Sequence, residues 1–223
     1  MTRLRCACVI PALNEEAAIS GVVSACRAQD LPVYVVDDGS RDATAERARS
    51  AGATVIVHET NLGKGRAMAD GLARAAADGH EAVVFLDADG QHDPAELPAF
   101  LSAAGEGADL VVGCRNLDAE RMPFLRRMTN RFTSWTLSLL AGRRLSDTQS
   151  GYRLVRVGVW PRIRPESGHF AAESEMLVRA ARQGARMAEV PIKTIYGEEV
   201  SHINPVRDTW RFIKLVARLA VMR

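Results

Sequence analysis

The sequence predicts an α/β fold with a mixed, mostly parallel central sheet. Two patterns in the first 115 residues indicate it: short apolar runs alternate with longer segments whose apolar residues recur at helical spacing, and polar residues directly follow several of the runs. Strands that alternate with helices form βαβ units, in which the strands are parallel and the crossovers right-handed. Residues 1–115 are therefore expected to form a doubly wound, Rossmann-like half that binds a nucleotide.

The elements of this half are expected to follow one another without long loops. Ile19, Val22 and Val23 recur at helical spacing, Pro94 stands near the start of a helix, and Gly79 suits the position just after a helix end. We expect strands at 5–11, 31–36, 54–58, 82–86 and 109–113, and helices at 14–27, 42–51, 63–77 and 94–104.

The second half, residues 116–223, has longer helical segments and fewer strands. We expect helices at 123–141, 173–183 and 204–222, and strands at 152–157 and 187–192. No internal repeat and no linker rich in Gly, Pro or Ser divides the chain. A single domain over residues 1–223 is therefore expected.

The composition is that of a soluble globular chain. It has 223 residues, of which 47% are hydrophobic and 25% charged, enough for one sizeable core. No apolar stretch approaches the ~18 residues of a membrane-spanning helix, and no apolar segment follows the first arginines as in a secretory leader. The four cysteines form no Cys-x-x-Cys pair, which favours reduced thiols in a cytoplasmic protein over a disulfide framework or a zinc ribbon.

Charge is distributed unevenly along the chain. Residues 1–110 carry 9 Lys or Arg against 17 Asp or Glu, whereas residues 111–223 carry 20 against 10. An acidic half suits a cation and a basic half suits an anionic partner, although solvated surface charge also produces such a division. Nucleic acid is not expected as that partner, because no recognition helix, zinc finger or aromatic-studded sheet is present.

Two expected helices of the basic half are amphipathic. Arg207, Arg211, Lys214 and Arg218 form one stripe of the C-terminal helix, beside a separate apolar face. The helix at 123–141 likewise carries arginines among large apolar residues. Both patterns predict peripheral contact with anionic lipid headgroups, and packing of the apolar faces on the core is the alternative.

Acidic residues end three of the expected strands. They are Asn14-Glu15-Glu16 after the first, Asp37-Asp38 after the second, and Asp87-Ala88-Asp89 after the fourth. Ligands of parallel sheets bind beyond the carboxyl ends of the strands. Carboxylates gathered there repel one another unless a cation or hydrogen-bond donors lie among them. Local caps and turns are the alternative for each cluster.

The third cluster is the sharpest signal for a metal. Asp87 and Asp89, with Gln91 close behind, supply hard oxygen ligands of the kind that hold Mg²⁺ or Mn²⁺ jointly with substrate phosphates. Such a metal would neutralise the diphosphate of a leaving nucleotide. The glycine-rich stretch around Lys64 opens a helix, and it is either a phosphate loop or a helix-starting turn with a basic residue.

The ordered set of motifs resembles family 2 of the glycosyltransferases. The strings are VIPALNEE, VVDDGSRDAT, NLGKGRAMADGL, FLDADGQHDP, VVGCRN, DTQSGYR, EMLVRA and VPI, and they span nearly the whole chain. Within the family they are most similar to the dolichyl- and polyprenyl-phosphate sugar synthases of the dolichol-phosphate mannosyltransferase type. The resemblance implies a GT-A fold, inverting transfer from a nucleotide sugar, and Mg²⁺ or Mn²⁺ as cofactor. It makes residues 1–115 the nucleotide-sugar half and residues 116–223 the acceptor half.

The resemblance also assigns roles to individual residues. Those implied to bind the nucleotide sugar are Pro11, Leu13, Glu15, Asp37, Asp38, Lys64, Asp87, Ala88, Asp89 and His202. The metal would be held by Asp87, Asp89 and Gln91, and the implied catalytic residues are Asp89, Arg115, Arg127 and Arg131. In the mannosyl members an Arg precedes Val-Tyr-Gly-Glu and Ser-Lys follows it. Here Thr194 and His202 stand at those places, so the donor sugar stays open.

The implied reaction is transfer of a hexose, from a GDP-mannose or UDP-glucose type of donor, to a dolichyl or undecaprenyl phosphate at the cytoplasmic face of a membrane, with a membrane partner protein as a further possibility. A phosphate acceptor is largely ionised at neutral pH and needs no strong base. A soluble saccharide or protein acceptor is an alternative, and it would need a carboxylate base such as Glu173, Glu175 or Asp147. The second alternative is a non-catalytic nucleotide-sugar-binding subunit.

Overall fold

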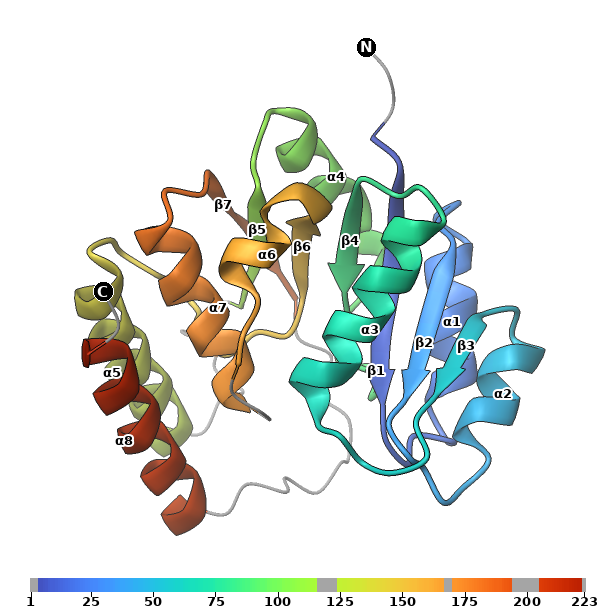
Figure 1. Cartoon of the computed structure of the whole chain (residues 1–223), viewed down its shortest axis with the longest axis horizontal. Helices are drawn as coiled ribbons and strands as arrows, with labels where there is room; N and C mark the ends of the chain where they lie inside the picture. The colour runs from blue at the N-terminus through green and yellow to red at the C-terminus, as the bar shows by residue number, and fades with distance from the viewer. Residues whose placement is uncertain (1–3, 116–123, 167–169, 194–204, 222–223) are drawn as a thin grey trace.

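The structure is a computed structural model that describes residues 4–115, 124–166, 170–193 and 205–221. One seven-stranded sheet lies between two layers of helices (Figure 1). The strands are β1 (Cys6–Ala12), β2 (Val33–Asp37), β3 (Thr54–Val57), β4 (Ala82–Phe85), β5 (Leu110–Arg115), β6 (Arg153–Arg156) and β7 (Met187–Ile192). Their order in the sheet is β3-β2-β1-β4-β6-β5-β7.

The sheet is mostly parallel, as expected, with one exception. Strand β6 is antiparallel to both of its neighbours, β4 and β5. In Figure 1 the arrows of β1, β2 and β4 point to the lower edge of the sheet, whereas β6 points away from it. Because β6 is reversed, the chain that enters β6 lies at the edge where β4 ends.

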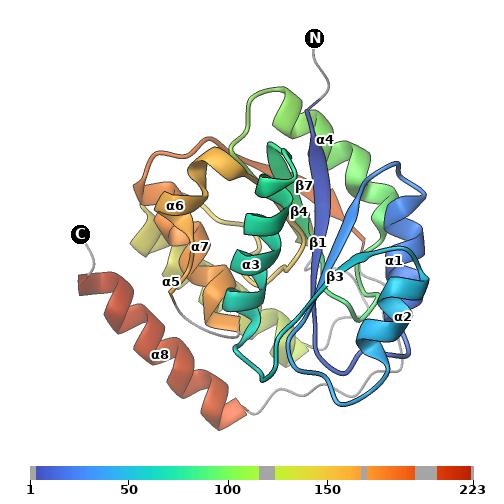
Figure 2. The ribbon, with the colours of Figure 1, turned by 45° about the vertical axis from the view of Figure 1, so that its right-hand side comes forward.

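The helices divide between the two faces of the sheet. One face carries α1 (Ile19–Arg27), α2 (Thr44–Ser50) and α4 (Leu97–Gly105), which follows a short 3₁₀ turn (Pro94–Glu96). The other carries α3 (Lys64–Ala77), α5 (Phe124–Ala141), α6 (Trp160–Ile163) and α7 (Phe170–Arg182), with α8 (Pro205–Val221) outermost (Figure 2).

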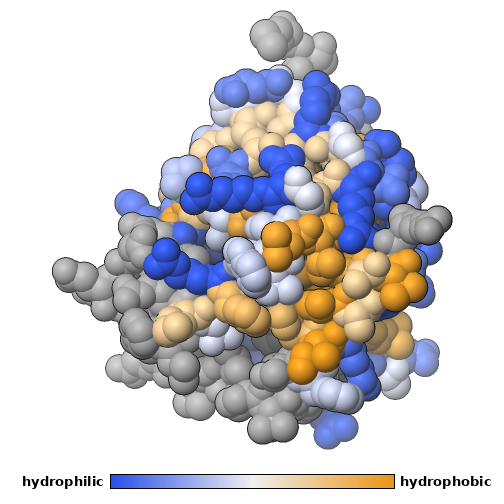
Figure 3. Space-filling view, turned by 90° about the vertical axis from the view of Figure 1, so that its left-hand side faces the viewer, coloured by the Kyte–Doolittle hydropathy of each residue, from blue (hydrophilic) through white to orange (hydrophobic). Residues whose placement is uncertain are grey.

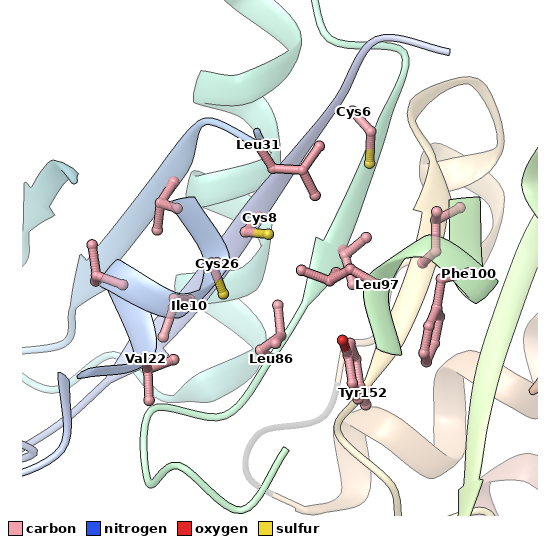
Figure 4. Packing of buried hydrophobic residues seen from close by; sticks show 14 of the residues in the cluster. Cys6, Cys8, Ile10, Val22, Cys26, Leu31, Leu86, Leu97, Phe100 and Tyr152 are labelled. Carbon is pink, nitrogen blue, oxygen red and sulfur yellow. The ribbon is translucent and has the colours of Figure 1, made fainter. Parts of the chain in front are cut away.

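Alternation along β1 shows how the strands serve both cores. Cys6, Cys8 and Ile10 point to the side of α1 and α4, whereas Ala7 and Val9 point to the side of α3. Figure 4 shows the first core, with the Cys8 and Cys26 thiols inside it. All four cysteines are free thiols, and burial raises the pKa of Cys6 to about 12, so this thiol stays protonated at neutral pH.

The expected elements are present, and the differences have physical causes. Helix α1 begins at Ile19 rather than at residue 14. Asn14 has a φ of 56°, its N–H donates to Ser40 after β2, and the Glu15 N–H donates to Thr44 at the start of α2. The short helix α6 was not predicted, since four residues leave no periodic pattern. Among the described residues, no helix has the length and apolar character that crossing a membrane requires.

Helix α8 is docked on α7 through apolar and ionic contacts. Leu215 and Leu219 are buried against the second core. Arg218 of α8 pairs with Glu166, just before α7, and lies 3.9 Å from the buried Glu175 of α7. Arg182 of α7 donates to the Leu219 carbonyl at 2.7 Å. The apolar face of α8 is thus partly used for core packing, which was the alternative for this helix, and its contact with lipid stays a prediction.

The packing of α3 on the sheet depends on the absence of a side chain at Gly71. A Cβ there would overlap Val9 Cγ1 and lie 2.9 Å from Val36 Cγ2. We expect Gly71→Ala to lower the free energy of unfolding by about 1–3 kcal/mol through overpacking. Gly21→Ala in α1 is the matched control, because a Cβ there meets nothing within 4 Å. It should stabilise the protein by about 0.5–1 kcal/mol. Urea unfolding of both variants measures the difference, and equal effects would contradict this account.

Candidate functional site

The acidic residues that end β1, β2 and β4 lie at one edge of the sheet. These strands are neighbours in the sheet, with Ala12 paired to Asp37 and Val9 to Phe85. The prediction that the three acidic clusters share one edge is therefore confirmed. Most of the carboxylate oxygens in these clusters have hydrogen-bond or ion-pair partners within the protein. These partners indicate the structural role of each cluster.

Asp38 holds the glycine-rich loop in place. Its Oδ1 accepts from the Leu62 N–H at 2.9 Å and contacts His58 Nδ1 at 2.7 Å, and its Oδ2 accepts from the Gly63 N–H at 2.8 Å. The neighbouring Asp37 is also buried and accepts from the Ser40 N–H at 3.0 Å. The carboxylates after β2 are therefore compensated by backbone donors, and Asp38 determines where the loop before α3 lies.

The first cluster joins the loop after β1 to the loop after β2. The Asn14 N–H donates to Ser40 Oγ at 2.9 Å, and the Glu15 N–H donates to Thr44 Oγ1 at 2.8 Å. Pro11 lies half-buried in β1, and Leu13 just beyond the strand is exposed. The backbone is therefore fixed by hydrogen bonds at this point. The Leu13 side chain is exposed, so it is accessible to a ligand.

Lys64, the first residue of α3, joins two distant carboxylates. Its Nζ lies 2.5 Å from Asp87 Oδ1 after β4 and 2.5 Å from Glu173 Oε1 in the first turn of α7. Burial disfavours the ammonium, but the two carboxylates outweigh it and raise the pKa of Lys64. Burial acts against the Asp87 carboxylate in the same way, yet Lys64 and His92 hold its pKa far below the usual range. Lys64 and Asp87 are therefore both charged at neutral pH.

The turn after β4 arranges the remaining groups of the Asp-x-Asp sequence. Gly90 has a φ of 76°, which turns the chain back so that the Gln91 N–H donates to Asp89 Oδ1 at 3.0 Å. His92 is buried, lies 3.3 Å from Asp87 Oδ2 and contacts the Tyr152 ring. Asp87 and Asp89 are half-buried, and Ala88 between them is buried. Both carboxylates remain within reach of solvent.

The segment that enters β6 forms the neighbouring wall, although its sequence carried little information by itself. Because β6 is antiparallel, Arg153 pairs with Phe85 and brings Gly151 beside Asp87. The fully buried Arg153 donates to the carbonyls of Ser150 at 2.9 Å, Thr148 at 3.1 Å and Glu173. One guanidinium thus fixes both this segment and the first turn of α7.

Arg115 ends β5 and is held rigidly by Asp147. Its Nε donates to Asp147 Oδ2 at 2.7 Å and its Nη2 to Oδ1 at 2.9 Å, a two-point contact. Burial opposes the charge of Asp147, but the Arg115 guanidinium lowers the pKa of this carboxyl. Arg115 is therefore fixed in orientation by its partner.

Arg115 and Arg131 line one groove. The groove has a volume of about 770 Å³ and lies between α5 and the loop that follows it, with Trp135, Leu139, Arg143 and Arg144 among its other walls. It combines cationic and apolar groups, the combination that an amphiphile with an anionic head requires. The side chain of Arg127 and all of His202 lie outside the described residues, so their assigned roles stay predictions.

The chain matches the family described as glycosyl transferase family 2 over residues 7–160. It belongs to that family. It is 32% identical over 208 residues to an undecaprenyl-phosphate mannosyltransferase of Micrococcus luteus, covering 87% of this chain and 85% of the relative. It is 36% identical over 189 residues to a dolichyl-phosphate hexose transferase of Haloferax volcanii, covering 83% of this chain and 81% of the relative.

Among solved structures, the fold is similar to that of glucosyl-3-phosphoglycerate synthase from Mycobacterium tuberculosis in complex with Mn²⁺, uridine diphosphate and phosphoglyceric acid. The TM-score is 0.74 at 23% identity, over 98% of this chain and 78% of that one. The protein is thus a glycosyltransferase with the GT-A fold that the resemblance implied.

The contact between Gly151 and Asp87 can be tested directly. A Cβ at position 151 would lie 2.7 Å from Asp87 Oδ1 and 2.8 Å from Cγ. We expect Gly151→Ala to displace this carboxylate and to lower sugar transfer by about 10²-fold, the cost of a small misplacement. Gly158→Ala is the control, since a Cβ there meets nothing within 4 Å. Initial rates of both variants, with their thermal unfolding midpoints, separate loss of the site from loss of the fold. Unchanged transfer in Gly151→Ala would contradict the contact.

Proposed function

We propose that this glycosyltransferase transfers a hexose from a nucleoside-diphosphate sugar to a polyprenyl phosphate, with inversion, at the surface of a membrane. The observation that carries the proposal is the groove beside α5, where Arg115 and Arg131 stand next to Trp135 and Leu139. An isoprenoid phosphate has this division into an anionic head and an apolar chain. The names of the two relatives, a polyprenyl-phosphate and a dolichyl-phosphate transferase, support the same acceptor class.

The residues after β4 fit a divalent cation that is held jointly with the donor diphosphate. Among the described residues, no three His, Cys, Asp or Glu side chains cluster as a complete metal site. Mg²⁺ is commonly bound by one or two carboxylates, with substrate phosphates completing the coordination. Asp87 and Asp89 would supply these two carboxylates. Gln91 is proposed as a further ligand of the cation beside these two carboxylates. When bound, the cation would neutralise charge on the leaving diphosphate. The Mn²⁺ and uridine diphosphate complex of the structural relative supports this assignment.

The donor sits, in this proposal, across the loops after β1 and β2. Pro11, Leu13 and Glu15 border the base and ribose, and Asp37 and Asp38 shape the same surface. Asp38 acts there by holding the glycine-rich loop rather than by an unoccupied oxygen. Lys64, already beside Asp87, faces the diphosphate. GDP-mannose and UDP-glucose types of donor both suit this arrangement.

The state of three buried carboxylates favours a phosphate acceptor over a hydroxyl acceptor. Glu173 is paired with Lys64, Glu175 with Arg179, and Asp147 with Arg115. Each side chain is at most 3% exposed. A general base must reach the proton that it removes. An ionised phosphate oxygen attacks the anomeric carbon without such a base, while Arg115 and Arg131 orient it.

The acceptor groove borders an exposed apolar surface, which we call the α5–α8 face. It consists of Met128, Phe132, Trp135, Leu139, Trp210 and Ile213, all at least 50% exposed. The two helices contact each other, and apolar side chains gather on this side of the molecule (Figure 3). Lys214 lies 5.6 Å from the Trp210 ring at its margin. An apolar surface with aromatic and basic residues suits the boundary of an anionic bilayer.

The reaction is tested by incubating the protein with Mg²⁺ or Mn²⁺, a short-chain polyprenyl phosphate and labelled GDP- or UDP-sugars. We expect label in the organic phase, abolished by a chelator and by Asp89→Asn. Asp30→Asn is the control, because Asp30 lies in a remote turn with a φ of 57° that Asn also adopts. Nucleotide release without lipid label would favour a soluble or protein acceptor. Absence of both lipid label and nucleotide release would favour a non-catalytic subunit.

Membrane contact has its own test. We expect Phe132→Glu to weaken binding to vesicles that contain phosphatidylglycerol by about tenfold, because burial of one such side chain contributes about 1.5–3 kcal/mol. Val57→Glu is the control, since Val57 is also 50% exposed but lies on β3, away from α5 and α8. Vesicle sedimentation measures both. Equal binding of Phe132→Glu and the unaltered protein would exclude this face as the membrane contact.

A further inference from the structure

The position of Lys64 is electrostatically unfavourable unless carboxylates compensate for it. It is the first residue of α3, where the unpaired N–H groups of the helix already produce a positive potential. Its side chain is only 25% exposed. Asp87 and Glu173 supply the compensation at 2.5 Å each, from two separate segments that both follow Lys64 in the sequence. The ammonium therefore has two strong partners where one would neutralise it.

The two partners differ in how they are held. Asp87 is 29% exposed, follows β4 in a turn, and is the residue assigned above to the divalent cation. Glu173 is 3% exposed, lies in the first turn of α7, and has its backbone carbonyl bound by the buried Arg153. Glu173 is thus the permanent partner of Lys64, whereas Asp87 has a second role as the proposed ligand of the cation.

A cation and the Lys64 ammonium would compete for the same carboxylate, because Nζ lies 2.5 Å from Asp87 Oδ1. We infer that Glu173 is a positioning residue that retains the Lys64 ammonium when a divalent cation binds Asp87. The exchange breaks one ion pair, keeps the other, and leaves Lys64 beside the diphosphate. This inference rests on the proposed assignment of Asp87 and Asp89 to the cation.

The reach of the Glu173 side chain makes the inference testable without changing charge. Glu173→Asp keeps the carboxylate but withdraws it by one methylene, so that Lys64 is left mainly on Asp87. Lys64→Met removes the competing ammonium altogether. Comparison of Glu173→Asp in the presence and in the absence of Lys64 then isolates the exchange from any general effect of the shorter side chain.

The probe is Mn²⁺ alone, titrated into the full chain, with free Mn²⁺ followed by electron paramagnetic resonance. We expect Glu173→Asp to weaken Mn²⁺ binding by about fivefold or more. In the Lys64→Met background the same change should alter the affinity by less than about twofold. Glu46→Asp, an exposed position in α2, should leave the affinity unchanged.

The outcomes separate this inference from the site assignment. Equal weakening by Glu173→Asp in both backgrounds, or none in either, overturns the role of Glu173 while the cation site stands. Unchanged Mn²⁺ binding by Asp89→Asn overturns the cation site, and the inference with it. Thermal unfolding midpoints of every variant, measured without Mn²⁺, identify any that fail to fold. If Glu173→Asp fails to fold, Glu173→Gln, which removes the charge, takes its place in both backgrounds, and it too should weaken Mn²⁺ binding only where Lys64 is present.

Discussion

The buried ammonium of Lys64 is the contact on which the geometry of the site depends. It joins the start of α3, the end of β4 and the start of α7 through two ion pairs of 2.5 Å. The segments that carry Lys64 and Glu173 are each positioned by a further buried polar contact. Asp38 holds the loop before Lys64, and Arg153 holds the turn that carries Glu173. Because partly satisfied networks are costly in a low-dielectric interior, these contacts stabilise one arrangement of the three segments.

The reversed strand β6 connects this network with the basic half of the chain. Its first residue, Arg153, lies beside the end of β4, and the segment before it carries Asp147, which binds Arg115 at the end of β5. One short stretch of chain, from Asp147 to Arg153, therefore borders both Asp87 and Arg115. Helix α7 makes a second connection, because Glu173 at its start faces the site while Arg182 at its end holds α8.

Much of the fold follows from patterns that are local in sequence. Apolar runs and helical spacing predicted all seven strands to within a few residues, because burial of both faces of a sheet leaves a clear signal. Strand direction leaves no such signal, so the sequence alone did not show which strand is reversed. The late start of α1 depends on a bond from the Glu15 N–H to Thr44, 29 residues away at the start of α2, and local capping preferences do not register such a contact.

The candidate site, like the fold, was predictable only where its signal is local in the sequence. The acidic residues that follow β2 and β4 were found because they end apolar runs. Their partners were not, since Glu173 lies 109 residues from Lys64 and only the folded chain brings them together. Asp38 resembled a ligand contact in sequence, whereas its oxygens bind the backbone of the next loop. The sequence does not distinguish an aspartate that positions a loop from an aspartate that binds a substrate.

The lack of a side chain at Gly151 has a consequence for how this sequence can change over time. The space that a Cβ would need is filled by the Asp87 carboxylate, which comes from a different strand and a different motif. We therefore expect substitutions at positions 87 and 151 to be epistatic. A larger residue at 151 is expected to be tolerated only after the carboxylate at 87 has gone, and that first step removes one of the two charges that balance Lys64. The order of the two substitutions is constrained, so the pair is expected to persist together or to be lost together as descendants diverge.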